Sequence, residues 1–265
     1  MSDLVISDPA RDLYSTLAQR AESSGDAVFL VDGDRTAAFT ELLHSADRVA
    51  AGLAARGIGA GDRVAIALNN RLEWAQAFFA TARLGAVLVT LNVRYRETEL
   101  LFMLEDSGAA LLISEARVGD FDFPPLHASI RDRLPGLRDV IYVEPPAESG
   151  LADFRELTAS DPAPAHPPVD PGTAALILYT SGTTGTPKGA VLTHRSLLSA
   201  ANGQVDRTRV GPGDSVLGIL PFNHVGGVTC TLLAMLLGGG QVILLPAFSP
   251  AAAMGLVRRH GVTIL

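Results

Sequence analysis

Lysine, cysteine and net positive charge are all scarce in this sequence. Cys230 is the only cysteine, which excludes an internal disulfide framework and fits a reducing cytoplasm. Because Cys230 lies in an apolar run, we expect it to be a buried small hydrophobic residue. The formal net charge of −7 excludes the basic surface that nucleic acid requires and the polybasic patch typical of membrane-surface proteins. Of the 21 Lys and Arg residues, only Lys188 carries a compact ammonium group, which suits a moving phosphate better than a planar guanidinium does.

Charged residues are also missing from a long stretch, residues 215–257, which holds no Asp, Glu, Lys or Arg. A membrane span is one interpretation. Glycines and prolines divide the stretch, however, and its longest uninterrupted piece, 228–237, is shorter than the roughly 20 residues that a spanning helix needs. We therefore predict a buried strand, helix and strand, and no transmembrane segment. The first nine residues lack a basic start and a long apolar region, so no signal peptide is expected.

Hydrophobic periodicity alternates between short strands and helices along most of the chain. Strands are predicted at 27–31, 37–39, 64–68, 87–90, 110–114, 174–178, 190–192, 216–219, 242–245 and 262–265. Helices are predicted from an N-cap at Thr40 to Gly57, and at 73–84, 98–107, 196–205, 227–237 and 250–260. This β-α-β-α-β pattern indicates an α/β fold made of layered parallel-sheet subdomains with helices on both faces.

Proline suggests where the chain divides. Residues 144–171 hold seven of the sixteen prolines, which disfavours both helix and sheet, so we predict an extended connection with a short helix near 151–158. The chain is accordingly expected to form two parts. An N-terminal α/β subdomain, 1–170, ends in this connection, and 171–265 begins a second α/β subdomain.

The second part opens on a strand and then on the segment LYTSGTTGTPKG, residues 178–189. Backbone N–H groups freed by glycine, Ser and Thr hydroxyls and the Lys188 ammonium group together suit a polyphosphate. The spacing excludes a Walker A loop, because Lys188 stands between Pro187 and Gly189, and the dinucleotide fingerprint and the serine-hydrolase elbow are absent as well. A Gly/Thr-rich surface turn between two strands is the alternative that composition alone leaves open.

The string TSGTTGTPKG, residues 180–189, closely resembles the signature loop of the adenylate-forming enzymes, which include acyl-CoA synthetases, luciferases and peptide-synthetase adenylation domains. The resemblance continues through 190–197 and reaches back to 39–43, 61–68, 82–87 and 91–92. Downstream, LPFNHVGG at 220–227 is similar to the family's histidine segment. Adenine, ribose and hinge motifs of the family are missing. The resemblance thus implies the first half of the large N-terminal domain, with the family's C-terminal half absent.

This resemblance implies an acid–thiol ligase, specifically an AMP-forming acyl-CoA synthetase of the cytoplasm and of fatty acid metabolism. A carboxylate, most naturally a fatty acid, attacks the α-phosphorus of ATP to give an acyl-adenylate and pyrophosphate, and coenzyme A then displaces AMP. The truncated chain alone is expected to be inactive. Two alternatives stay open: an acyl-AMP ligase or amino-acid adenylation domain, and a non-catalytic binding or assembly module. An unpaired sheet edge further predicts self-association.

The resemblance also implies roles for individual residues. Those expected to bind the β- and γ-phosphates are Thr180, Ser181, Gly182, Thr183, Thr184, Gly185, Lys188 and Gly189. Mg²⁺ is expected to arrive with ATP, held by phosphate oxygens and by Thr184. Lys188 and His224 are the expected catalytic residues, with His224 orienting the carboxylate. The substrate channel is assigned to Asn223, His224, Gly226 and Gly227. Without the resemblance, His224 reads as a core or cap histidine, and His194 is expected to cap a helix.

Overall fold

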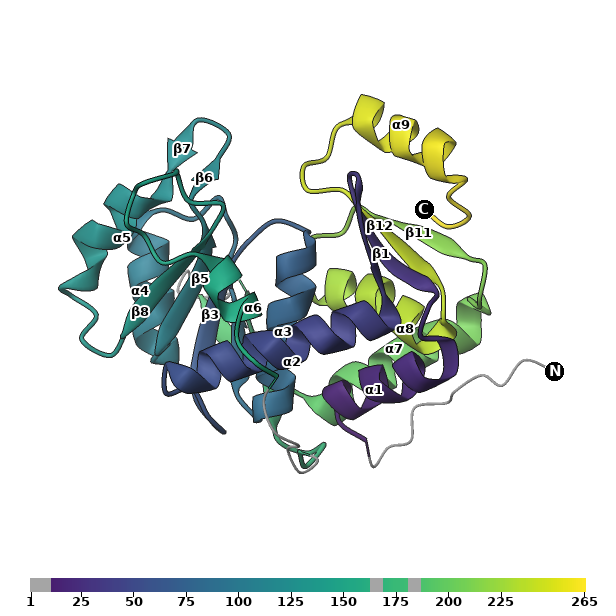
Figure 1. The fold of residues 1–265 in the computed structure, drawn as a ribbon, viewed down its shortest axis with the longest axis horizontal. Coiled ribbons are helices and arrows are strands. Elements are labelled where there is room, and N and C mark those ends of the chain that lie inside the picture. The colour runs from purple at the N-terminus through teal and green to yellow at the C-terminus, as the bar shows by residue number, and fades with distance from the viewer. Residues whose placement is uncertain (1–10, 163–168, 181–186) are drawn as a thin grey trace.

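Two sheets with helices packed between them form the molecule, and a computed structural model describes residues 11–162, 169–180 and 187–265 of it (Figure 1). The larger sheet has six strands in the order β10-β9-β4-β3-β5-β8, and the smaller has four in the order β11-β12-β1-β2. Their strands are β1 (Val28–Asp32), β2 (Arg35–Ala38), β3 (Arg63–Ala67), β4 (Val87–Thr90), β5 (Leu111–Glu115), β8 (Asp139–Val143), β9 (Ala174–Thr180), β10 (Lys188–Thr193), β11 (Ser215–Gly218) and β12 (Gln241–Leu244). A separate hairpin joins β6 (Arg117–Val118) to β7 (Phe121–Asp122).

The helices follow the strands in close alternation. They are α1 (Leu13–Ser24), α2 (Phe39–Ala55), α3 (Leu72–Leu84), α4 (Glu97–Ser107), α5 (Phe123–Arg131), α6 (Phe154–Thr158), α7 (His194–Thr208), the π-helix η1 (Gly227–Leu233), α8 (Ala234–Gly238) and α9 (Pro250–His260). Within the sheets, β9, β4, β3, β5 and β8 pair in parallel, as do β11, β12 and β1. Antiparallel pairing occurs where β10 meets β9 and where β2 meets β1. The predicted α/β fold with parallel sheets between helices is confirmed.

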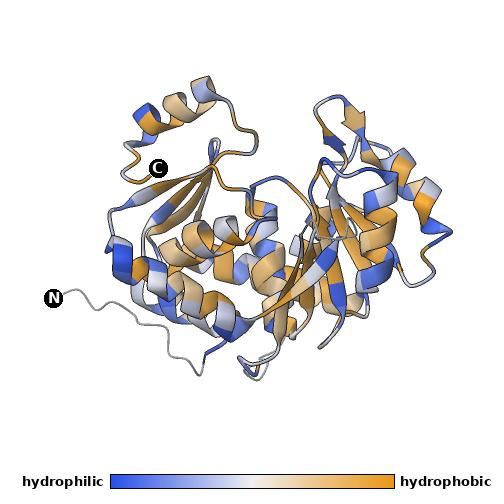
Figure 2. Cartoon of the chain, turned by 180° about the vertical axis from the view of Figure 1, so that it is seen from behind, coloured by the Kyte–Doolittle hydropathy of each residue, from blue (hydrophilic) through white to orange (hydrophobic). Residues whose placement is uncertain are grey.

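In the inner strands of both sheets, alternating side chains enter different cores, so helices cover both faces of these strands. In β3, Val64 and Ile66 join the central core beneath α2 and α3, whereas Ala65 and Ala67 pack with residues of α4 and α5 on the outer face. In the four-stranded sheet, residues of β12 are divided in the same way between the central core and the small cluster beneath α9. Figure 2 shows that the strands and the helices between the sheets are largely hydrophobic in sequence.

The predicted boundary at residue 170 does not separate the sheets. The six-stranded sheet takes β9 and β10 from beyond this residue, and the four-stranded sheet joins β1 and β2 to β11 and β12. Strands from the first part of the chain therefore pair with strands from the second: β1 with β12, and β4 with β9. Whether 1–170 and 171–265 act as separate subdomains stays a prediction.

Two local predictions were wrong, and a third was met with a difference. The helix expected at 227–237 is present, but its first part, η1, is a π-helix that continues into α8. Thr40 does not cap its helix: α2 starts directly from β2, its N-cap is Ala38, and the Thr40 hydroxyl donates to the Gly25 carbonyl at 2.9 Å. The strand expected at 262–265 is reduced to one isolated bridge between Ile264 and Val216. In addition, α1, α5, the β6–β7 hairpin and β8 were not predicted.

No helix within the described ranges is both long and apolar enough to cross a bilayer.

Candidate functional site

The ends of the glycine-rich loop are held together by an antiparallel pair of strands. Lys188 lies opposite Thr180 and Gly189 opposite Tyr179 in the register of β9 and β10. Lys188, Thr180 and Gly189 are all exposed or partly exposed. The other residues assigned to phosphate lie outside the described part of the chain: Ser181, Gly182, Thr183, Thr184 and Gly185. The structure thus brings one hydroxyl and the lone ammonium group to the mouth of the hairpin.

Strand β9 anchors this hairpin in the six-stranded sheet. Leu176 and Leu178 are buried, and Tyr179 lies against α4, where its hydroxyl donates to Asp106 Oδ2 at 2.7 Å. A Cβ on Gly189 would lie 3.0 Å from Ile177 Cγ2, which is tighter than ordinary van der Waals contact. Glycine at this position therefore leaves room for the Ile177 side chain of the neighbouring strand β9. The base of the loop is therefore rigidly supported.

His224 lies in a tight turn after β11, within residues 219–226, which we call the histidine segment. Its backbone N–H donates to Pro221 O at 3.0 Å, and its Nδ1 accepts from the Gly226 N–H at 3.1 Å. With Nδ1 an acceptor, the neutral ring carries its proton on Nε2. The side chain is exposed, so an imidazole N–H of fixed orientation is presented at the surface.

Glycine and an aromatic anchor shape the same turn. A Cβ on Gly227 would lie 2.1 Å from Pro221 O, so no other residue fits there without a shift of the backbone. Phe222 is 1% exposed and packs on Trp74 of α3 with the ring centroids 5.0 Å apart. Asn223 is half-buried between Phe222 and His224. The four residues assigned to the substrate channel therefore share one turn.

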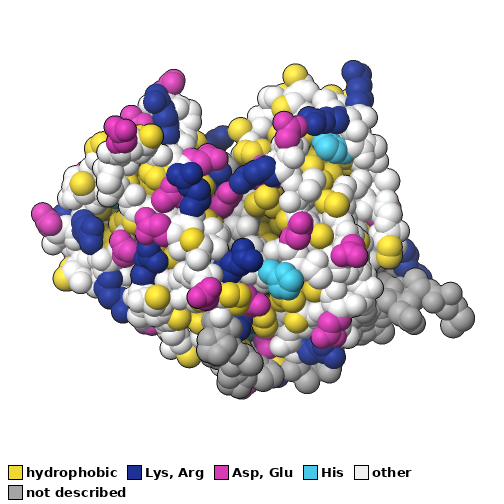
Figure 3. Space-filling view, in the orientation of Figure 1, with side chains coloured by type: hydrophobic (Ala, Val, Ile, Leu, Met, Phe, Trp, Pro, Cys, Tyr) yellow, Lys and Arg dark blue, Asp and Glu magenta, His cyan; other side chains and the backbone are white. Residues whose placement is uncertain are grey.

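Both segments follow the carboxyl ends of parallel strands. The glycine-rich loop follows β9, which runs parallel to β4 and, through it, to β3; the histidine segment follows β11. Asn70, just after β3, donates to Gly218 O and Leu220 O at 2.9 Å each, so the two carboxyl edges meet. Figure 3 shows a notch in the surface between the part that holds the six-stranded sheet and the part that holds the four-stranded sheet. Ligands of open α/β sheets bind outside the carboxyl ends of strands, and this edge is our candidate site.

Sequence reasoning missed two asparagines in the turn between β3 and α3, of which only Asn70 supports the histidine segment at this edge. Asn69 and Asn70 directly follow a predicted strand, a position that could have marked them. The backbone N–H of Asn69 donates to Glu115 Oε1 at 2.7 Å, and burial raises the pKa of Glu115. Both asparagines thus fix the path of the chain between β3 and α3.

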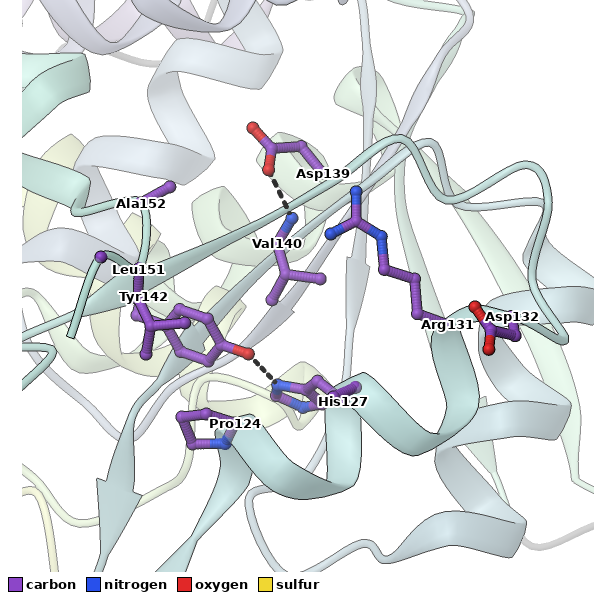
Figure 4. Close-up of a pocket in the computed structure, with 11 residues that line it drawn as sticks. Pro124, His127, Arg131, Asp132, Asp139, Val140, Tyr142, Leu151 and Ala152 are labelled. Carbon is purple, nitrogen blue, oxygen red and sulfur yellow. Dashed lines mark hydrogen bonds between the residues drawn. The ribbon is translucent and has the colours of Figure 1, made fainter.

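A separate cavity of about 410 Å³ lies between α5 and β8 (Figure 4). His127 is 1% exposed, and its Nδ1 lies 3.1 Å from the Tyr142 hydroxyl. Burial lowers the pKa of His127 to about 4 and raises the pKa of Tyr142 to about 12. β8 is the edge strand opposite β10, so the width of the sheet separates this cavity from Lys188. The His127 Nε2 is itself buried, and Tyr142 belongs to the hydrophobic core on the outer face of the six-stranded sheet.

One further expectation was wrong, for Cys230, and one was met at a different helix, since His194 accepts from the first N–H of α1. Cys230 is exposed, because it lies on an outward-facing position of η1. His194 does not cap α7: Thr193 does, its Oγ1 accepting from the Ser196 N–H at 3.1 Å. His194 is instead buried, its Nδ1 accepts from the Leu13 N–H at 3.3 Å, and burial lowers its pKa. Its role is to join α7 to α1.

Metal ligation by side chains alone finds no support within the described ranges, where no three His, Cys, Asp or Glu residues form a group able to hold an ion. Thr184, the residue assigned to Mg²⁺, lies outside those ranges.

Comparison with known proteins places these features in a family. A family model described as "AMP-binding enzyme" matches residues 17–265. The chain is 33% identical over 263 residues to 4-coumarate–CoA ligase 3 of Oryza sativa subsp. japonica, covering 97% of the chain and 46% of the ligase. It is 33% identical over 227 residues to a long-chain-fatty-acid–CoA ligase of Thermus thermophilus, covering 85% and 41%. The chain thus spans less than half the length of either relative.

A solved structure agrees with the fold. O-succinylbenzoate coenzyme A synthetase from Bacillus subtilis, in complex with AMP, superposes with a TM-score of 0.77 at 28% identity, and the match covers 94% of the present chain and 60% of the synthetase chain.

Proposed function

The chain belongs to the AMP-binding enzyme family, and from this premise we propose that it supplies the phosphate-binding part of an ATP-dependent acid–CoA ligase. Its relatives by name are ligases that join an acid to coenzyme A. The whole reaction is a proposal, because the chain spans less than half of those relatives. A carboxylate attacks the α-phosphorus of ATP, the bond to pyrophosphate breaks, and a mixed acyl-phosphate anhydride forms. The thiol of coenzyme A then attacks the acyl carbon and AMP leaves.

The observation that carries this proposal is the pairing of Lys188 with Thr180 at the mouth of the β9–β10 hairpin. An exposed ammonium group and a hydroxyl at the base of a glycine-rich loop are suited to charged phosphate oxygens. Displacement at phosphorus needs charge neutralisation and positioning more than covalent help. We assign Lys188 and the loop residues 180–185 and Gly189 to the β- and γ-phosphates.

His224 is proposed to orient the carboxylate. Its Nε2 proton can donate to a carboxylate oxygen while Nδ1 is held by the Gly226 N–H. Asn223 and the two glycines that follow His224 leave room for the acyl group beside it. Mg²⁺, if bound with ATP, would rest on phosphate oxygens and Thr184, where it neutralises phosphate charge.

For the acid, we propose both a general substrate class and one particular kind of acid. A carboxylic acid is the substrate class, and a fatty acid is the finer proposal. One relative is named for 4-coumarate and another for long-chain fatty acids, so aromatic acids compete with fatty acids for this role. Action in the cytoplasm and in fatty acid metabolism belongs to the same finer proposal.

Exchange of labelled pyrophosphate into ATP tests the proposal. The assay uses the full-length form, meaning this chain with any sequence that its gene encodes beyond it, and offers octanoate, palmitate and 4-coumarate in turn. We expect acid-dependent exchange, and AMP release only when coenzyme A is added. The 265-residue chain alone should bind ATP weakly and show no exchange. Exchange that is absent with every acid, or independent of acid, contradicts the proposal.

A further inference from the structure

Asn70 joins the two sheets directly behind the histidine segment. Its side chain is 4% exposed. Nδ2 donates to the carbonyl oxygens of Gly218 and Leu220 at 2.9 Å each, and Oδ1 accepts from the Phe222 N–H at 2.8 Å. Both amide protons and the oxygen are therefore used, and all three bonds end on one short stretch of chain.

The segment that Asn70 holds has few other fixed points. Its remaining hydrogen bonds are local: Ile219 N–H to Leu217 O, His224 N–H to Pro221 O, Gly226 N–H to His224 Nδ1, Val228 N–H to His224 O, and Thr229 Oγ1 to Val225 O. Among the described residues, Asn70 is the one partner from a distant part of the chain, 148 to 152 residues away in sequence. Phe222, two residues before His224, is held from one side by this bond and from the other by Trp74.

Asn70 is also connected to the phosphate side of the site, through the strands of the six-stranded sheet. It follows β3, which pairs with β4, and β4 pairs with β9, whose end carries Thr180 opposite Lys188. β11, before the histidine segment, belongs to the other sheet. Asn70 is thus the polar link between the sheet that bears the phosphate loop and the turn that bears His224.

We propose that Asn70 is a positioning residue that holds His224 at a fixed distance from the phosphate loop. The inference rests on the proposed function, since it assigns a purpose to that site's geometry. A buried amide with three bonds can also serve stability alone. The two roles differ in what a substitution changes: misplacing His224 slows the chemical step with bound ATP, whereas a stability role affects folding and leaves the turnover of folded enzyme unchanged.

The test compares Asn70→Ala with Asn69→Ala in the full-length form. Asn69 is the matched control, because it is the same residue type in the same loop and bonds to Glu115 instead of the histidine segment. For Asn70→Ala we expect the kcat of pyrophosphate exchange to fall about 10- to 100-fold, with the KM for ATP within about twofold. Asn69→Ala should leave kcat within about twofold. The double variant Asn70→Ala/His224→Ala should be no slower than His224→Ala, because Asn70 is proposed to act only through His224, whose imidazole is already gone.

Asn70→Asp provides a second variant in case Asn70→Ala does not fold. It keeps an acceptor for the Phe222 N–H and loses the donors to Gly218 and Leu220, and we expect the same loss of kcat. Trp74 is the only tryptophan and is fully buried, so its emission reports the contact with Phe222 without any assay of activity. A red-shifted emission with unchanged far-UV circular dichroism is expected for both Asn70 variants.

Three results overturn the inference: unchanged kcat in folded Asn70 variants, effects that multiply with His224→Ala, or emission equal to that of Asn69→Ala. Failure of the proposed function is distinguishable, because the unaltered protein then shows no acid-dependent exchange while the emission comparison still decides whether Asn70 holds the segment.

Discussion

At the scale of single residues, the site depends on side chains that the fold leaves exposed. Lys188 and His224 both reach the surface, and neither contributes to a described core cluster. Their surroundings are nevertheless fixed, by the β9–β10 register for one and by the Gly226 N–H for the other. Substitutions at these positions should therefore change function with little change in stability.

Lys188→Ala tests the phosphate assignment. Removal of the ammonium group should raise the KM for ATP in exchange at least about tenfold, while the free energy of unfolding stays within about 0.5 kcal/mol. Lys188→Arg keeps the charge but not its compact shape and should restore only part of the loss. Arg195→Ala, an exposed cation on α7, is the control and should change neither quantity. A KM for ATP that is the same in Lys188→Ala and the unaltered protein contradicts the assignment.

At the scale of elements, the tight junctions between strands, turns and helices decide where the functional residues lie. The turn after β11 closes on itself so tightly that a Cβ on Gly227 would lie 2.1 Å from the Pro221 carbonyl oxygen, and η1 starts at this glycine. The core around α5 and β8 is closed by a buried histidine–tyrosine pair. Each junction gives a prediction about stability.

Gly227→Ala should destabilise the protein by about 2–3 kcal/mol, because the new Cβ would need a shift of the backbone. Gly203→Ala is the matched control. Gly203 lies in α7, where an added Cβ would meet no atom within 4 Å, and the change should stabilise by about 0.5–1 kcal/mol. Urea unfolding measures both. Equal effects of the two substitutions would show that the turn is not as tight as described.

Burial of His127 should make stability depend on pH. The pKa of His127 is lowered from 6.5 to about 4 in the fold, so between these values the unfolded chain binds the extra proton. The contribution of neutral His127 to the free energy of unfolding is complete above about pH 6.5. It is lost as the pH falls toward 4, and the free energy of unfolding then changes by up to about 1.4 kcal/mol per pH unit. Urea unfolding of the unaltered protein and His127→Phe at pH 7, 6, 5 and 4.5 isolates this contribution as their difference. A difference that does not vary with pH contradicts it.

Local patterns predict most of the elements but not their partners. Strands such as β3 and β4 are continuous apolar runs between helices of clear periodicity, so the α/β layering is readable from the sequence. Helix α1 could also have been predicted, because Asp12 caps it and Leu13, Leu17 and Ala21 recur at helical spacing. Its partners could not: Arg20 donates to Leu236 O at 2.9 Å and also to Leu237 O, more than 200 residues away. The run DVIYV of β8 likewise carries a strand pattern that could have been predicted. A π-helix cannot be told from an α-helix by apolar spacing, which accounts for η1.

The site is predictable to the extent that it is written in contiguous motifs. The glycine-rich string and the histidine segment identify Lys188 and His224. The position of Asn70 after a predicted strand could have marked it, but its role could not be read from the sequence, because it depends on carbonyl groups about 150 residues later in the chain. The exposure of Cys230 likewise depends on which side of η1 faces outward.

At the scale of the whole molecule, the chain ends its six-stranded sheet on an unprotected strand. No described strand pairs with the outer edge of β10, and Val191 on that strand is 59% exposed. Open edges of this kind are templates for pairing with a second chain.

We therefore expect the 265-residue chain to self-associate with rising concentration, as measured by sedimentation velocity. Val191→Lys should weaken the association by about tenfold or more, because a charge on an edge strand opposes pairing. Ser199→Lys adds the same charge on the exposed face of α7 and should leave association unchanged. A single monomeric species at all concentrations contradicts the expectation.

The central claim is that the β9–β10 hairpin and the histidine segment together receive ATP. Hydrogen–deuterium exchange of the full-length form, with and without ATP, tests it most directly, with Lys188→Ala measured in parallel. The account predicts that ATP slows exchange in peptides covering 178–193 and 219–227, and that Lys188→Ala abolishes the effect at the same ATP concentration. Protection confined to other peptides, such as those around His127, with these two unchanged, would contradict it.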